Sequence, residues 1–345
     1  MKITVFGAGG WGTALAATLA QRHTEVWLYA RNIDLVSSLR QTRCNQRYLP
    51  EVFLPDSVQI LADAAVAIKD AAILILATPS HGVRLAARQI APLLPHGCKL
   101  ISVAKGLETD SCLRMSEVLL QEIPALTGRL AVLSGPNHAE EVGRKIPSAA
   151  VVASKDRELA EQVQDALMTD YFRIYTNHDV AGVELAGALK NIIALAAGVA
   201  DGLGFGDNTR AALMTRGLTE MARLGAACGA ETATFSGLAG LGDLIATCTS
   251  PHSRNRRAGL AIAAGRTISE IQAESGMVIE GVRATDAAWK LAQAKGVAMP
   301  ITATLYQVLY ENLSPHAAVM ELMTRGRKHE REEVAFPSST EMRDY

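Results

Sequence analysis

Cysteine is scarce in this sequence and shows no pairing pattern. The 345 residues include five cysteines, an odd number, and no two of them form a CxxC pair. This distribution excludes a disulfide framework, and neither the cysteines nor the eight histidines have the spacing of metal ligands. We therefore expect a reducing compartment, no metal site, and structural or surface roles for these residues. The cysteines are Cys44, Cys98, Cys112, Cys228 and Cys248.

Aromatic residues and net charge are low as well. Aromatic residues make up 5% of the chain and hydrophobic residues 49%, with 28 glycines. This composition is more typical of a tightly packed α/β or helical enzyme than of a β-sandwich. The formal net charge of -1 argues against general binding to nucleic acid or anionic membranes, which requires a basic excess. Any recognition of anions is expected to be local.

Long uninterrupted hydrophobic runs are absent too. The most hydrophobic later stretch, residues 185–199, carries Lys190 and Asn191 at its middle, which disfavours a membrane span. The apolar start resembles a secretory signal only superficially, because four glycines within residues 7–12 would break its apolar core and no charged n-region precedes it. We expect a cytoplasmic protein without stable membrane insertion.

Short apolar runs alternate with helical patterns through the first half of the chain. The runs are apolar throughout, as expected for strands covered by helices on both faces, and they predict a doubly wound parallel sheet. After Thr176 the segments are rich in Ala, Leu and Gly at helical spacing, with no convincing strand. The length also favours two domains. We expect a sheet domain at 1–180, an all-helical domain at 181–328 and a polar tail at 329–345. The six runs are ITVF, EVWLYA, AILILATP, KLISVA, LAVLSG and AAVVAS.

A glycine-rich turn follows the first run and opens a helix. Its GxGxxG pattern in this strand-turn-helix context is typical of Rossmann-type dinucleotide-binding domains. Gly7 would permit the tight turn, Gly9 would let the backbone approach a pyrophosphate, and Gly12 would allow close packing of helix and strand. The free N–H groups of the helix N-terminus would bind the anion. The alternative is a glycine-rich turn without a ligand.

The end of the second apolar run predicts which dinucleotide is bound. An NAD-preferring site would place Asp or Glu there, against the ribose 2′-hydroxyl. Glu25 stands at the wrong end of the run, whereas Arg31 at its end offers a guanidinium suited to a 2′-phosphate. We expect NADPH as the cofactor, with NADH also possible. The alternative is that Arg31 stacks on adenine or faces solvent.

Ligands of doubly wound sheets bind beyond the carboxyl ends of the strands. Three runs are followed there by polar residues, at 78–81, 105–106 and 135–138. Lys105 would bring a point charge that suits a phosphorylated or carboxylated substrate, although an isolated lysine is more often a surface residue.

Lys190 has an unusual position for a cation. Its helical face otherwise carries small or apolar residues, so partial desolvation would make its ammonium easier to deprotonate. Proton exchange with a carbonyl or hydroxyl group requires this property. The alternative is a lysine that snorkels to the edge of the domain.

A later glycine-rich segment, GLAGLGDLIATCTSPHSRNRR, contains Asp243 and then three arginines. Asp243 could orient a lysine ammonium, and the arginines could bind a phosphate. A solvated basic face would explain the arginines equally well. The arginines are Arg254, Arg256 and Arg257.

Taken together, these segments resemble the bacterial NAD(P)-dependent glycerol-3-phosphate dehydrogenases along nearly the whole chain. The resemblance implies a Rossmann domain, a helical domain, and reversible reduction of dihydroxyacetone phosphate to sn-glycerol 3-phosphate for phospholipid synthesis. The similar segments are GAGGWGTALA, the 105–106 turn, VLSGPNHAEEV, ELAGALKNIIALAAGVADGLGFGDNTRAAL, GLAGLGDLIATCTSPHSRNRRAG and VIEGVRAT.

The resemblance also implies roles for individual residues. Lys190 would be the catalytic proton donor and acceptor, with Asp243 as its partner. Substrate contacts would come from these two and from Lys105, Gly135, Asn137, Ser253, Arg254 and Asn255. Cofactor contacts would come from Gly7, Gly9, Gly10, Trp11, Gly12, Arg31, Tyr48, Lys105, Ala139, Arg254, Val278 and Glu280.

One short segment departs from the family pattern, and two other functions remain open. Many members read Gly-Pro-Ser-Phe where this chain has Gly-Pro-Asn-His, so the contact of Asn137 is less certain. A β-hydroxyacid dehydrogenase would share the two-domain plan, but such enzymes resemble a KxxxN arrangement, and here Asn191 directly follows Lys190. A catalytically silent NADPH-sensing module is the other alternative. The sequence does not fix the oligomeric state, for which a homodimer is the candidate.

Overall fold

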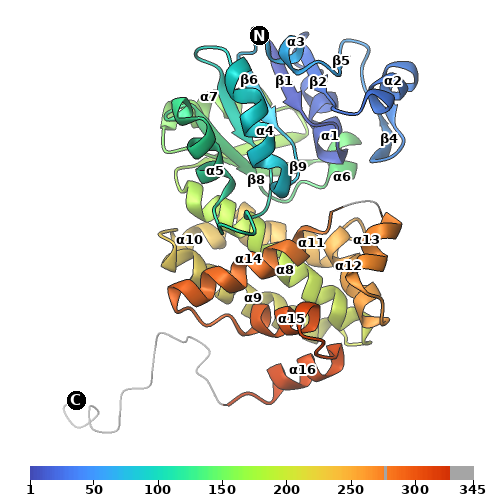
Figure 1. Ribbon diagram of the computed structural model, residues 1–345, viewed down its shortest axis with the longest axis vertical. Coiled ribbons are helices and arrows are strands. Elements are labelled where there is room, and N and C mark those ends of the chain that lie inside the picture. Colours follow the sequence, from blue (N-terminus) through green and yellow to red (C-terminus); the bar gives the residue numbers. More distant parts are fainter. Residues whose placement is uncertain (276–277, 327–345) are drawn as a thin grey trace, which may run out of the picture.

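The structure, a computed structural model, describes residues 1–275 and 278–326 (Figure 1). It contains an α/β part that carries the N-terminus and a helical part packed below it in that view. The change from strand to helix falls between β10, which ends at Asn177, and α8, which begins at Val180. The expected polar tail at 329–345 lies outside the described residues.

The α/β part is built on an eight-stranded sheet with the order β10-β9-β8-β7-β6-β1-β2-β5. A separate two-stranded sheet pairs β3 with β4. The strands are β1 (Ile3–Phe6), β2 (Val26–Tyr29), β3 (Cys44–Asn45), β4 (Leu49–Phe53), β5 (Gln59–Leu61), β6 (Ile73–Leu76), β7 (Lys99–Ser102), β8 (Leu130–Ser134), β9 (Ser148–Ala153) and β10 (Phe172–Asn177).

One strand pair departs from the expected parallel arrangement. The run AAVVAS forms β9, and β9 lies antiparallel to β8, while β10 is parallel to β9. A parallel return would need a crossover element as long as the sheet is deep. The connection at 135–147 holds only the short helix α6 (Ala139–Gly143), which packs against α1 (Gly10–Leu19). The chain therefore turns back at the end of β8 and returns beside it as β9.

Helices cover both faces of the sheet, as the all-apolar strands predict. One hydrophobic core joins the sheet to α1, α2 (Ile33–Thr42) and α7 (Arg157–Leu167). A second core, on the other face, joins it to α3 (Ala64–Ile68), α4 (Val83–Ile90) and α5 (Met115–Glu122). Short 3-10 turns lie at η1 (Ser80–Gly82), η2 (Ala91–Leu93) and η3 (Pro124–Leu126). The Rossmann-type, doubly wound fold is confirmed.

The helical part is arranged around α8 (Val180–Gly202). Its most hydrophobic window is long and apolar enough for a membrane span, but 83% of it is buried, which is typical of a core helix. Among the described residues, no strand follows β10. The surrounding elements are α9 (Asp207–Ala227), α10 (Thr232–Phe235), the π-helix η4 (Leu238–Gly242), α11 (Asp243–Thr249), α12 (Arg254–Ala263), α13 (Ile268–Ser275), α14 (Glu280–Lys295), α15 (Pro300–Tyr310) and α16 (Pro315–Met323).

Two glycines allow α8 and α12 to cross closely. A Cβ atom at Gly198 would lie 2.0 Å from the carbonyl oxygen of Arg256, and one at Gly259 would lie 2.2 Å from that of Leu195. Backbone atoms cannot move aside as a flexible side chain can, so each position requires glycine. This crossing fixes the start of α12 relative to the middle of α8.

Candidate active site

The glycine-rich turn has the geometry expected of a dinucleotide cradle. Gly7 has a φ of +122°, and a Cβ there would lie 2.6 Å from the carbonyl oxygen of Ala77. A Cβ at Gly12 would lie 1.9 Å from the carbonyl oxygen of Gly7, whereas one at Gly9 would meet no atom within 4 Å. The turn and the helix are thus tightly packed, and the space above Gly9 is open to a ligand.

The start of α1 has the polar groups that a pyrophosphate requires. Gly9 is its N-cap residue and supplies no side-chain cap, so the first N–H groups of the helix face outward unpaired by a side chain. Nearby on the next strand end, the buried hydroxyl of Thr78 has no hydrogen-bond partner among the described residues. These observations fit a phosphorylated cofactor.

Tyr48 and Ala139 border this helix start. A Cβ at Gly10 would lie 2.9 Å from the carbonyl oxygen of Tyr48 and 3.8 Å from the Cβ of Ala139. No local sequence pattern indicates a role for Asn45, whose side chain donates to Ala8 O at 3.0 Å and to Thr13 Oγ1 at 2.7 Å. Asn45 thereby holds the β3–β4 loop against the glycine-rich turn.

Trp11 has a packing role in addition to its expected cofactor contact. Its ring lies edge-on to that of Phe172, with centroids 6.1 Å apart. Phe172 is the first residue of β10 and is fully buried. This contact ties the start of α1 to the region around the sheet edge.

Arg31 is the second residue after the end of β2 and is exposed. The next residue, Asn32, accepts a hydrogen bond from Leu35 N at 2.9 Å and caps α2. Glu25 lies at the opposite end of the strand, 3.2 Å from the amino group of Met1. No carboxylate therefore occupies the strand end where an NAD-preferring site would place one.

The predicted catalytic residues lie together between the two parts. Lys190 Nζ, on α8, donates to Asp243 Oδ1 at 2.8 Å. Lys105 Nζ, beyond the end of β7, donates to the other carboxylate oxygen, Asp243 Oδ2, at 2.9 Å. The side chains of Lys190 and Asp243 are only 6% and 2% exposed, so Lys190 does not reach the domain edge. One buried carboxylate bridges two ammonium groups.

The electrostatics of this bridge follow from burial and from the two cations. Burial alone would raise the pKa of Asp243, but the Lys105 and Lys190 ammonium groups outweigh it and hold that pKa below its ordinary value. Burial, together with the charge of Lys190, lowers the pKa of Lys105 to about 8 despite the attraction of Asp243. Asp243 is therefore an anion at neutral pH.

Further polar groups complete the cluster. Thr247 Oγ1 accepts from Lys190 Nζ at 2.6 Å, a residue that sequence reasoning missed although it lies one helical turn after Asp243. Lys105 Nζ also donates to Gly135 O and to Asn137 Oδ1, both at 2.8 Å. The Asn137 amide nitrogen is buried and has no partner among the described residues.

The expected phosphate-binding residues surround the start of α12. Ser253 caps this helix by accepting from Arg256 N at 3.2 Å. Arg254 is exposed, with Nη1 3.5 Å from Val278 O, whereas Arg256 binds Asp201 at 2.8 Å and is not available as a phosphate ligand in this arrangement.

Asn255 and Asn191 connect this helix start to the lysines. Asn255 Nδ2 donates to Asn191 Oδ1 at 2.8 Å, and Asn255 Oδ1 accepts from Gly281 N at 2.9 Å. The Asn191 amide in turn donates to Lys105 O at 3.3 Å. The sequence pattern identifies Asn191 only as the neighbour of Lys190. Its bonds to Lys105 and Asn255 join residues that are far apart in the chain, so no local pattern predicts them.

Glu280, expected as a cofactor contact, uses both carboxylate oxygens on Ser80. Ser80 N donates to Oε1 at 3.1 Å and Ser80 Oγ donates to Oε2 at 2.6 Å. A Cβ at Gly106 would lie 3.0 Å from the same carboxylate. Glu280 therefore joins the helical part to the strand ends that border the cradle.

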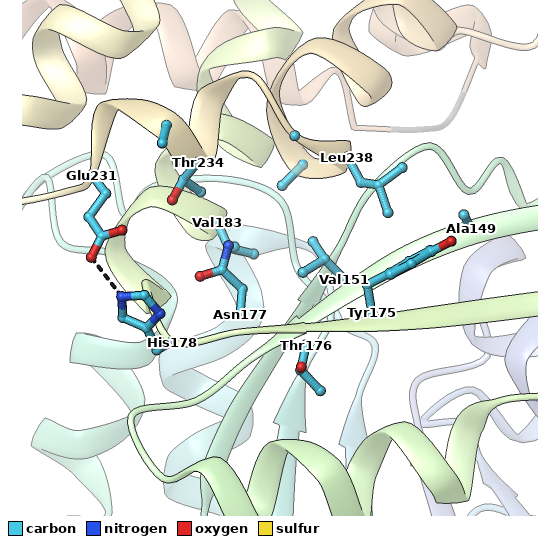
Figure 2. Close-up of a pocket in the computed structure, with 13 residues that line it drawn as sticks. Ala149, Val151, Tyr175, Thr176, Asn177, His178, Val183, Glu231, Thr234 and Leu238 are labelled. Carbon is cyan, nitrogen blue, oxygen red and sulfur yellow. Dashed lines mark hydrogen bonds and ion pairs between the residues drawn. The ribbon is translucent and has the colours of Figure 1, made fainter.

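A separate open cavity of about 610 Å³ lies between the sheet edge and α10 (Figure 2). Figure 2 shows the contact between His178 Nε2 and Glu231 Oε1, which are 2.6 Å apart, at one end and Tyr175 at the other. None of the expected site residues lines this cavity. It is therefore distinct from the lysine and aspartate cluster.

The described residues contain no cluster of His, Cys, Asp or Glu that could hold a metal.

Comparison with known proteins places this geometry in a family. Residues 2–160 match the model for the N-terminus of NAD-dependent glycerol-3-phosphate dehydrogenase, and residues 179–320 match the model for its C-terminus. A glycerol-3-phosphate dehydrogenase [NAD(P)+] of Pelotomaculum thermopropionicum is 52% identical over 339 residues, covering 98% of this chain and 97% of that protein. The Bacillus subtilis enzyme is 48% identical, with coverage of 96% and 97%.

A solved structure agrees with these sequence relationships. The glycerol-3-phosphate dehydrogenase of Coxiella burnetii superimposes with a TM-score of 0.89 at 39% identity, covering 94% of this chain and 99% of that one. Both the cofactor-binding part and the helical part are matched. The chain belongs to the NAD(P)-dependent glycerol-3-phosphate dehydrogenase family, which confirms the resemblance inferred from its motifs.

Proposed function

We propose that Lys190 gives the proton when this glycerol-3-phosphate dehydrogenase reduces dihydroxyacetone phosphate to sn-glycerol 3-phosphate. The observation that carries the proposal is the buried bridge of Lys190, Asp243 and Lys105. Asp243 orients the Lys190 ammonium until the substrate oxygen accepts its proton. In the reverse direction Lys190 takes the proton back, as microscopic reversibility requires.

In this proposal Asn137 holds the reacting end of the substrate, while Lys105, whose three N–H donors are all used within the protein, positions Asn137 and supplies positive charge. Lys105 is fixed by Asp243, Gly135 and Asn137. Because the Asn137 carbonyl faces Lys105, its amide nitrogen faces away from that lysine, and a substrate oxygen would satisfy this buried donor. Fixed donors of this kind raise the rate by orienting the substrate and stabilising the developing oxyanion.

The substrate phosphate is assigned to the start of α12. Ser253, Arg254 and Asn255 lie there, at the positive end of a ten-residue helix. Arg254 offers a guanidinium that can bind a phosphate through two hydrogen bonds, and its exposure leaves it free to move toward the substrate.

The cofactor is assigned to the cradle of Gly7, Gly9, Gly10 and Gly12, with Trp11, Tyr48, Ala139, Val278 and Glu280 around it. Its nicotinamide supplies the hydride when bound. This chain's own part is to hold the pyrophosphate at the start of α1 and to select the 2′-substituent through Arg31. The enzyme uses NAD(P), and we propose that NADPH is preferred to NADH.

In the cell, the product would feed glycerophospholipid synthesis, and the enzyme would work in the cytoplasm. All five cysteines are free thiols, which suits a reducing compartment. A homodimer is the assembly we propose, and light scattering after size-exclusion chromatography measures it directly.

The Lys190→Ala variant tests the catalytic proposal. Turnover should fall by about 10²- to 10⁴-fold, the usual contribution of general acid catalysis, while NADPH binding stays nearly unchanged by fluorescence titration. Loss of NADPH absorbance upon adding dihydroxyacetone phosphate, compared with 3-oxoacids and 2-oxoacids, separates this activity from that of a β-hydroxyacid dehydrogenase and from a silent sensor. An active Lys190→Ala enzyme would refute the assignment of Lys190 as the proton donor.

A further inference from the structure

His138 lies beside the catalytic cluster, although its sequence context suggested only a structural or surface role. It follows Asn137 in the loop after β8 and precedes α6. Its ring is partly buried, with Nε2 3.4 Å from the carbonyl oxygen of Ala246 on α11, the helix that carries Asp243. The imidazole thus bridges the two parts of the molecule next to the active site.

The groups that face His138 come from several elements. Burial lowers its pKa below the ordinary value, and the ammonium groups of Lys190 on α8 and Lys105 after β7 lower it further. The Ala246 carbonyl and the Asp243 carboxylate on α11 oppose this to a smaller extent. In the free enzyme near neutral pH the ring is therefore neutral, with its Nε2–H directed to Ala246 O.

His138 also lies near the proposed phosphate-binding residues. Its ring centroid is 6.5 Å from that of His252. His252 immediately precedes Ser253, which caps α12. The positive charges of the two lysines therefore act on the His138 ring. The negative charge of any anion that binds at the start of α12 acts on it as well.

We propose that His138 takes up a proton when the phosphorylated substrate binds and then donates its Nδ1–H to the substrate phosphate. This inference rests on the proposed function. A phosphate monoester carries about two negative charges at pH 7, which offset the two ammonium groups that keep the empty site's imidazole neutral. The proton comes from solvent and is added to Nδ1. The Nε2–H continues to donate its hydrogen bond to Ala246 O, so no other bond changes. The imidazolium then makes a charge-assisted hydrogen bond.

If His138 gains a proton on binding, the affinity for the substrate depends on pH. The group responsible, His138, is not part of the Lys190–Asp243–Lys105 bridge. A phenylalanine at this position could pack in the same space but cannot titrate. Replacement of His138 by Phe should therefore weaken phosphate recognition while the Lys190 and Asp243 pair stays in place. We expect KM for dihydroxyacetone phosphate to rise about tenfold at pH 7 and kcat to change much less, since a hydrogen bond to a charged group is lost.

Calorimetry measures the proton directly. The enzyme, saturated with NADPH at pH 7.5 so that no hydride acceptor is present and no turnover occurs, is titrated with sn-glycerol 3-phosphate in buffers that differ in ionisation enthalpy. At this pH the ligand phosphate is already a dianion, so any net uptake belongs to the protein. We expect uptake of a few tenths of a proton by the wild-type enzyme, and none by His138→Phe or by His138→Gln, which retains a polar side chain. Glycerol, which lacks the phosphate, should cause no uptake.

Each alternative outcome has a distinct reading. Unchanged uptake in both His138 variants would place the proton on another group, such as Lys105 with its pKa of about 8, and would overturn the proposal. Absence of uptake in the wild-type enzyme would also overturn it, while turnover of dihydroxyacetone phosphate would leave the proposed function standing. A wild-type enzyme without that turnover would instead refute the proposed function.

Discussion

Lys190 Nζ and Asp243 Oδ1 lie 2.8 Å apart in an almost fully buried ion pair. The same carboxylate also binds Lys105, so its removal would leave two neighbouring cations without a counter-charge. Asp243 is therefore more than a hydrogen-bond acceptor, because it sets the charge of the cluster.

The Asp243→Asn variant should lose most of its activity. We expect kcat to fall by about 10²-fold or more and the free energy of unfolding to fall by about 3 kcal/mol, because breaking a buried pair leaves an uncompensated charge. Steady-state kinetics and urea unfolding measure the two effects. Thr247→Val removes a neutral hydroxyl that accepts from Lys190 Nζ and donates to Asp243 Oδ1 at 3.1 Å, but it leaves the carboxylate charge in place, so this control should lose less of both. Equal losses in the two variants would contradict a special role for the carboxylate charge.

Arg31→Asp should reverse the cofactor preference. A carboxylate there would repel the 2′-phosphate of NADPH and accept a hydrogen bond from the ribose 2′-hydroxyl of NADH. We expect the ratio of kcat/KM for NADPH to that for NADH to fall by about tenfold or more, with kcat on dihydroxyacetone phosphate little changed. The effect should shrink at high salt, since the site is exposed. An unaltered ratio would mean that Arg31 does not contact the cofactor.

Glu220 should make stability depend on pH. Its buried carboxylate on α9 accepts hydrogen bonds from Thr302 N and Thr302 Oγ1, both at 3.2 Å, at the start of α15. Burial nevertheless raises its pKa to about 7, against the opposing effect of these hydrogen bonds. The folded state therefore binds this proton more tightly than the unfolded state does, so the stabilisation is complete below about pH 4.5 and is lost as pH rises toward 7.

The size of this effect is on the order of 3 kcal/mol across that interval. Urea unfolding of the wild-type enzyme and of Glu220→Gln, at a series of pH values between 4.5 and 8, gives the difference curve. Because other groups titrate in the same range, the difference between the two proteins is the measurement. A difference that does not vary with pH would contradict the raised pKa.

Gly198→Ala should destabilise the helical part. The new Cβ would lie 2.0 Å from the carbonyl oxygen of Arg256, and only a shift of α12 away from α8 can relieve the contact. We expect a loss of about 1 to 3 kcal/mol, visible as a lower melting temperature. Gly206→Ala is the control, because a Cβ there meets no atom within 4 Å; since Gly206 is the N-cap of α9, where Ala is less favourable than Gly, the loss should be up to about 1 kcal/mol. Similar melting temperatures for the two variants would show that the crossing can relax.

Features encoded by short segments could be predicted from the sequence. Residue spacing within a single element is enough to predict the glycine-rich turn, the all-apolar strands and the apolar surroundings of Lys190. Each of these features depends only on residues that are close in the sequence. The reversal of β9 could not be read in this way, because an all-apolar run looks the same in either direction. Its direction depends on where α6 packs.

The shared use of Asp243 was equally hidden. Sequence reasoning gave Asp243 one lysine partner, whereas the structure adds Lys105 from 138 residues away. The bonds of Asn191 to Asn255 and of Glu280 to Ser80 also span the fold. Such contacts arise from the docking of whole helices, and no local periodicity records them.

The close crossing of α8 and α12 works as a molecular ruler. It sets the span between Lys190, on one helix, and the phosphate-binding residues at the start of the other, and the Asn191 to Asn255 hydrogen bond locks that span. A substrate is then selected by the number of bonds between its carbonyl and its phosphate. Homologues of dihydroxyacetone phosphate with one additional carbon between these groups should be able to engage either end of the ruler, but not both.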